Sequence, residues 1–227
     1  MTDFRSDRRR LIGAGALLGW AGLLAGSRAS AQSSPEPKNW TPTDDAKDSW
    51  LDRPGTRHRS VIDTSDAESG QAGLYVANNL YQSNKDGYGI EAKDIGMVVV
   101  LRHLSAPFGY NDKMWSKYGS HFADALKLEG KDAIRAAKAN PLLTAEDPDD
   151  KDAVTLSTLF AKGARFPVCA IATHGAAMQI AKKTKGSAEE IEKELGANLI
   201  PGAVMAASGV LAVNRAQEHG YTFVSTA

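Results

Sequence analysis

The feature that most constrains the fold is the stretch Ile95–Leu101, which reads Ile-Gly-Met-Val-Val-Val-Leu and contains no polar side chain. A strand that is apolar at every position must be covered on both faces, which is typical of a central strand in a parallel sheet. Patterns typical of strands and of helices alternate around it through residues 57–227. The sequence therefore predicts a three-layer α/β domain with a mostly parallel, five-stranded sheet.

The remaining elements are predicted from hydrophobic spacing and turn residues. Four more strands are expected at residues 58–63, 168–172, 203–207 and 221–224. Helices are expected at residues 69–80, after Asn111, and at 156–164, 173–181, 187–199 and 208–220. Thr173 is the expected N-cap of its helix. The charged stretch 129–154 is predicted to be a surface excursion.

Residues 1–31 have the composition of an export signal. Arg8 and Arg9 are followed, after one residue, by two apolar residues, which fits the twin-arginine pattern. The apolar stretch that follows is too short and too weakly hydrophobic for a membrane span, and Ala29 and Ala31 are the small residues that a signal peptidase requires. We expect export by the twin-arginine machinery, cleavage after Ala31, a periplasmic location and no stable membrane span afterwards. The alternative is an uncleaved N-terminal anchor.

Residues 32–56 are rich in Pro, Ser, Thr and Asp, and we interpret them as a linker. Trp40 and Trp50 are unusual in such a segment, so one or both are expected to dock on the domain or on a neighbouring subunit. The alternative is disorder. The whole chain has 27 basic and 27 acidic residues, so its charge does not indicate a nucleic-acid partner.

Cys169 is the only cysteine of the chain, which excludes an internal disulfide. It lies near the carboxyl end of a predicted central strand that runs directly into a helix, where open α/β sheets place their ligand crevices. The positive end of the helix favours a thiolate, whereas the apolar neighbours Val168 and Ala170 oppose ionisation by desolvation. Cys169 is therefore a reactive thiol, half of an intermolecular bridge, or a small buried hydrophobic residue.

His103, preceded by Arg102, ends the other central strand, so it could share a crevice with Cys169. His174 could assist if the start of its helix turns toward the strand end. A histidine beside a cysteine can activate the thiol or bind a metal. Two ligands are too few for a metal site, and no spacing such as CxxC or HExxH is present, so no metal is expected.

Asn111, Asp112 and Trp115 follow the same strand and could line the crevice from the loop above it. Their alternative roles are helix capping for the two polar residues and packing for the tryptophan. The loop 105–109 lacks the GxGxxG pattern that cradles a dinucleotide, so no nucleotide or flavin cofactor is expected.

Three segments, taken in order, resemble the DsrE/DsrF-like family, in particular its exported members with twin-arginine signals. They are residues 98–103 with 111–112 and 114–115, residues 167–169, and residues 199–204 with 208–213, 216–217 and 220–221. The resemblance covers roughly residues 57–227 and implies a flavodoxin-like sheet in a homo-oligomer, a trimer or a multiple of it. In the sulfur-relay members, a cysteine after the third strand carries a persulfide, and Cys169 matches that position approximately.

Two functions from different classes follow from these patterns. The first is a periplasmic thiol or sulfur carrier that acts through Cys169, with His103 or His174 tuning the thiol. The second is a non-catalytic, oligomeric module that binds a small or sulfur-bearing ligand in a crevice roofed by residues 104–118.

Overall fold

The computed structural model describes residues 45–53 and 55–226. The predicted signal peptide, with Arg8, Arg9, Ala29 and Ala31, lies outside the described residues, as does the first part of the predicted linker, with Trp40. In the part that is described, no helix combines the length and the apolar character needed to cross a membrane.

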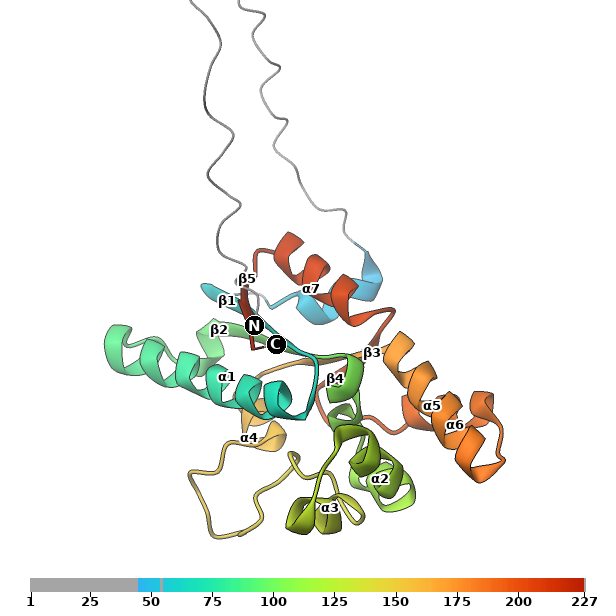
Figure 1. The fold of residues 1–227 in the computed structure, drawn as a ribbon. Helices are drawn as coiled ribbons and strands as arrows, with labels where there is room; N and C mark the ends of the chain where they lie inside the picture. The colour runs from blue at the N-terminus through green and yellow to red at the C-terminus, as the bar shows by residue number, and fades with distance from the viewer. Residues whose placement is uncertain (1–44, 54, 227) are drawn as a thin grey trace, which may run out of the picture. The chain divides into compact units, whose positions relative to one another are not determined.

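Five strands form one parallel sheet at the centre of the domain (Figure 1). They are β1 (His58–Thr64), β2 (Ile95–Leu101), β3 (Phe166–Cys169), β4 (Ala203–Ala206) and β5 (Thr222–Ser225), in the spatial order β4-β3-β2-β1-β5. β2 is the central strand, and every one of its residues is buried. All of the strand pairs are parallel, so the predicted parallel five-stranded sheet is confirmed.

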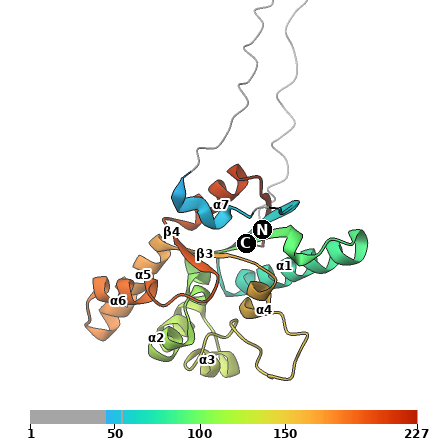
Figure 2. The same cartoon turned by 180° about the vertical axis from the view of Figure 1, so that it is seen from behind.

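Helices cover both faces of this sheet and complete a three-layer flavodoxin-like α/β fold (Figures 1 and 2). One face carries α1 (Ala67–Tyr88), α2 (Asp112–Leu126), α3 (Gly130–Ala136), α4 (Leu156–Ala161), α5 (Ala170–Thr184) and α6 (Ala188–Gly196). The other face carries α7 (Gly209–Glu218) and the 3-10 helix η1 (Ala46–Leu51). Two further 3-10 helices, η2 (Ala92–Asp94) and η3 (His103–Gly109), precede and follow β2.

The order of the strands explains this unequal division of helices. From β1 to β4 the chain steps in one direction across the sheet, and right-handed crossovers place all of the connecting helices on the same face. The last crossover, through α7, returns in the opposite direction to reach β5, so α7 lies on the other face. Flavodoxin itself reverses direction after its second strand, whereas this chain reverses after its fourth.

Residues 45–53, which the composition indicated as linker, pack on the α7 face. Leu51 is fully buried, and Trp50 packs against the same apolar cluster. The Tyr221 hydroxyl donates to the carbonyl of Leu51 at 2.9 Å. Trp50 therefore docks on the domain, as the sequence indicated, and the packed domain extends further toward the N-terminus than residue 57.

Several element boundaries differ from the sequence prediction by a few residues, among them those of α1, β3 and α5. α1 continues to Tyr88, past the predicted end at residue 80, because its polar last turns remain helical until Gly89, whose left-handed backbone (φ 65°) ends the helix. β3 begins at Phe166 and ends at Cys169, earlier at both ends than the predicted 168–172. The earlier end of β3 places Cys169 at the junction with α5.

A buried amide anchors the predicted surface excursion 129–154, which contains α3 and otherwise irregular backbone. Asn140 is 1% exposed, and its Nδ2 donates to the carbonyls of Phe108 at 2.7 Å and Tyr110 at 2.9 Å. The excursion therefore holds the segment between β2 and α2 in place, at the carboxyl edge of the sheet.

Gly119→Ala is expected to destabilise the domain. A β-carbon at Gly119 in α2 would lie 2.0 Å from the carbonyl oxygen of Ala136 in α3, a backbone atom that cannot rotate away. Overpacking of this kind costs about 1–3 kcal/mol of the free energy of unfolding. Gly87→Ala in α1 is the control, because a β-carbon there meets no atom within 4 Å and alanine favours a helix. Urea denaturation measures the free energy of unfolding of both variants, and equal stability of the two would contradict the α2–α3 contact.

Candidate functional site

The carboxyl ends of β1, β2 and β3 bring together an aspartate, an arginine and the cysteine. Leu101 lies opposite Val168 in the register of β2 and β3, so the next residues along, Arg102 and Cys169, end adjacent strands side by side. Asp63 lies near the end of β1, the other neighbour of β2. We call Asp63, Arg102 and Cys169 the carboxyl-edge cluster.

Arg102 is held in this cluster by a bidentate ion pair with Asp63. Its Nε and Nη2 donate to the two carboxylate oxygens of Asp63, each at 2.7 Å, and the two side chains are 26% and 11% exposed. These hydrogen bonds to Asp63 raise the pKa of Arg102, and the charge of Cys169 as a thiolate raises it further. The guanidinium is thus fixed in orientation, and its residue ends the strand next to that of Cys169.

Cys169 is both the last residue of β3 and the N-cap of α5. Its Sγ accepts a hydrogen bond from the backbone N–H of Ala172 at 3.4 Å, and the residue is 7% exposed. The prediction that Thr173 caps this helix was wrong. The earlier end of β3 gives the cap position to the thiol, and the Thr173 hydroxyl donates instead to the carbonyl of Cys169 at 3.0 Å and accepts from the Tyr110 hydroxyl at 2.8 Å.

The two histidines predicted to tune the thiol have partners elsewhere. The Nδ1 of His103 lies 3.3 Å from the carbonyl of Ser65, and the backbone of His103 is left-handed (φ 51°). The Nδ1 of His174 lies 2.7 Å from a carboxylate oxygen of Glu192 in α6, on the exposed surface. Each histidine thus has a partner of its own, His103 in the loop after β1 and His174 in α6.

A second helix also begins beside Arg102. Ser208 caps α7, with its hydroxyl accepting from the N–H of Leu211 at 3.1 Å. A β-carbon on Gly209 would lie 2.3 Å from that of Arg102, so the first turn of α7 packs directly on the arginine. Because the N-terminus of a helix carries partial positive charge, α5 and α7 both add to the positive potential of this edge.

The other predicted crevice residues have structural contacts at the start of α2. Asn111 is the N-cap, with its Oδ1 accepting from the N–H of Met114 at 3.3 Å. Asp112 accepts from the N–H of Asn140 at 2.8 Å. Trp115 is fully buried, and its Nε1 donates to the carbonyl of Pro107 at 3.0 Å. These contacts fix η3 and the excursion, and the indole is enclosed in the core.

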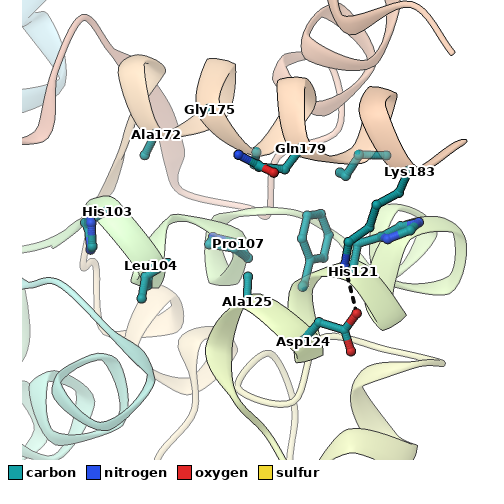
Figure 3. A pocket seen from close by; sticks show the side chains of 13 residues that line it. His103, Leu104, Pro107, His121, Asp124, Ala125, Ala172, Gly175, Gln179 and Lys183 are labelled. Carbon is teal, nitrogen blue, oxygen red and sulfur yellow. Dashed lines mark hydrogen bonds and ion pairs between the residues drawn. The ribbon is translucent and has the colours of Figure 1, made fainter. Parts of the chain in front are cut away.

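A separate groove of about 480 Å³ lies between α2, η3 and α5 (Figure 3). The α5 wall consists largely of the small residues Ala172, Gly175 and Ala176, which leave space opposite Pro107 and Ala125. His103 lies at one end, and an ion pair between Lys183 and Asp124 (2.9 Å) spans the other end. This α2–α5 groove has an apolar floor and a polar rim, which is the usual character of a small-molecule site.

Asp63 is the site residue that sequence reasoning missed. It was recognised as the end of the first strand, but an aspartate at a strand end is common, and only the spatial order of the strands makes it the neighbour of Arg102. Within residues 45–53 and 55–226, no group of three or more His, Cys, Asp or Glu side chains is arranged to hold a metal ion.

We expect Asp63 and Arg102 to be strongly coupled in their effect on stability. Removing one partner leaves a poorly solvated charge on the other. The destabilisation caused by Asp63→Asn and that caused by Arg102→Gln should therefore add up to more than the destabilisation of the double variant. A double-mutant cycle by urea denaturation should give a coupling energy of about 1–3 kcal/mol. The exposed pair Lys93–Asp94 is the control, at about 0.2–1 kcal/mol. A coupling no larger than the control value would contradict the fixed ion pair.

Comparison with known proteins does not assign the chain to a family. No protein-family model matches it, and no curated protein is significantly similar to it. The resemblance to the DsrE/DsrF-like family therefore stays a prediction, and the carboxyl-edge cluster and the α2–α5 groove are the two features of the domain that bear on function.

Proposed function

We propose that the chain is a thiol carrier of the exported DsrE/DsrF-like type, in which Cys169 accepts a sulfur atom and passes it on. The observation that carries this proposal is the hydrogen bond from the N–H of Ala172 to the Sγ of Cys169 at the start of α5. A backbone donor at a helix N-terminus stabilises the thiolate, which is the nucleophilic form of cysteine.

The transfer needs only a thiolate and a donor that carries a sulfane sulfur. The Cys169 thiolate attacks the terminal sulfur of a donor persulfide R–S–SH, a new S–S bond forms, and the old S–S bond breaks. The products are the Cys169 persulfide, Cys–S–SH, and the donor thiolate R–S⁻. Because the electron pair leaves with R–S⁻, the exchange requires no further oxidant or reductant.

Arg102 takes the role that the sequence suggested for a histidine. A guanidinium keeps its charge at all physiological pH values, and Asp63 fixes its orientation through two hydrogen bonds. The carboxylate offsets part of the positive charge, so Asp63 limits the stabilisation of the thiolate while it positions Arg102. Once the Cys169 persulfide has released its proton to solvent, the same guanidinium and the same N–H donor stabilise the resulting anion.

The low exposure of Cys169, 7%, favours a small or extended donor that reaches the sulfur with a single atom. We further propose, on the resemblance, that the protein is exported by the twin-arginine route and assembles as a homo-oligomer, a trimer or a multiple of it.

The α2–α5 groove supports a second candidate function, the non-catalytic binding of a small ligand. Its volume of about 480 Å³ lies in the range of ordinary ligand pockets. Cys169 is not among the residues that line it. Binding there would leave the thiol unused, so the two candidate functions predict different results when Cys169 is replaced.

Incubation of the reduced, folded protein with a low-molecular-weight polysulfide should add sulfur to Cys169 alone. Intact-protein mass spectrometry should show the gain of one sulfur atom in the wild type and none in Cys169→Ser. Arg102→Gln should slow the uptake several-fold, because it removes the charge beside the thiolate. His103→Ala and His174→Ala are the matched controls and should leave the rate unchanged, since both side chains have partners elsewhere.

Uptake by the urea-unfolded chain without uptake by the folded protein would contradict the carrier. That result would leave the α2–α5 groove as the candidate site. An effect of His174→Ala as large as that of Arg102→Gln would also contradict the assigned role of the arginine.

A further inference from the structure

The opposite, amino edge of the sheet gathers cationic side chains. Arg53 and Arg165 both donate through Nη1 to the carbonyl of Gly163, the latter at 3.4 Å. Arg59 donates through Nη2 to the carbonyl of Arg53 at 3.4 Å. Arg59 lies at the start of β1, and Arg165 directly precedes β3, so the three guanidinium groups meet at this edge.

These cations have neutral partners. Arg59 also donates to the carbonyl of His219 at 2.8 Å and to the hydroxyl of Thr56 at 3.0 Å, and the remaining bond of Arg165 goes to the carbonyl of Ala164 at 3.1 Å. In the described part of the chain, none of the three arginines has a carboxylate within ion-pair distance. Burial lowers the pKa of Arg165, and the charge of Arg53 lowers it further. Three like charges therefore lie together without an ion-pair partner among the described residues, and two of them lie over aromatic rings, Arg59 over Tyr221 and Arg165 over Phe160.

A buried phenol completes the cluster. Tyr81 in α1 is 4% exposed, and its hydroxyl has no hydrogen-bond partner among the described residues. Burial raises the pKa of this phenol to about 12, and the charges of Arg53 and Arg165, which act in the opposite direction, are the next largest influences. The carbonyl that accepts from both guanidinium groups belongs to Gly163, the residue after Lys162, and the phenol stays protonated and able to donate. Lys162 lies over the same ring, with Nζ 5.8 Å from its centroid.

The unused donors point to the chemistry of a ligand. An arginine has five N–H groups. In both Arg53 and Arg165, Nη1 is the only nitrogen of the guanidinium that has an acceptor among the described residues. A buried hydroxyl without a hydrogen-bond partner destabilises the folded protein. One compact anion with several acceptor oxygens would supply the missing negative charge, would accept from the planar arginine forks and would satisfy the phenol.

We propose that Arg53, Arg165 and Tyr81 form a binding site for a small oxyanion, sulfate or phosphate, either free or as the end group of a small molecule. Lys162 and Arg59 add charge at its border. The site lies at the opposite edge of the sheet from Cys169 and does not depend on the thiol chemistry proposed above.

Isothermal titration of the folded protein with sodium sulfate and sodium phosphate, against sodium chloride at matched ionic strength, tests this site. The wild type should bind sulfate or phosphate saturably, at one site per chain. Tyr81→Phe should weaken binding on the order of tenfold, because it removes one hydrogen bond to a charged group. In the absence of anion the same variant should be no less stable than the wild type, because it removes a hydroxyl that has no partner.

Arg165→Gln should abolish saturable binding, and Arg135→Gln, which changes an arginine whose partners are Thr144 and Glu146, is the matched control. Phenyl phosphate separates the two sources of the ligand. Binding of phenyl phosphate without binding of either free anion would assign the site to an end group of a small molecule. Equal affinity of the wild type and Tyr81→Phe, or the absence of saturable binding of all three probes, would overturn the proposal.

Discussion

The complete burial of β2 is the constraint on which the rest of this structure depends. Each of its valines removes apolar surface worth about 1.5–3 kcal/mol from water, and both faces of the strand take part. Neighbouring strands must then flank it on both sides, and helices must cover it above and below. In the resulting strand register, Arg102 lies beside Cys169 at the carboxyl edge of the sheet. Arg165 lies at the amino end of β3.

The single reversal of chain direction after β4 gives the two edges different characters. At the carboxyl edge, α5 and α7 both begin beside Arg102, so two helix N-termini and one guanidinium act on the same small volume. Asp63 offsets part of this potential through its ion pair. At the amino edge, the arginines have carbonyl and hydroxyl partners, and the compensating charge is missing from the described residues. The proposed attraction of anions therefore has a different physical origin at each edge.

The sequence predicted the features that local pattern determines. The apolar run of β2 indicated a central parallel strand, and the strand-to-helix transition placed Cys169 at the carboxyl edge. Thr173 was expected as the cap because its hydroxyl can accept from a backbone N–H, but the earlier end of β3 gave Cys169 the cap position. The directions of His103 and His174 depend on Ser65 and Glu192, which lie far away in the sequence. Periodicity carries no information about such partners, nor about the pairing of Asp63 with Arg102.

The rate at which iodoacetamide alkylates the reduced protein at neutral pH, compared between the folded and the urea-unfolded chain, tests the central claim most directly. Cys169 is the only thiol, so the rate reports on this one sulfur atom. If the start of α5 and Arg102 stabilise the thiolate and leave it accessible, the folded protein reacts faster than the unfolded chain, and Arg102→Gln reduces the difference. Reaction that occurs only after unfolding would identify Cys169 as a buried structural residue and would contradict the account.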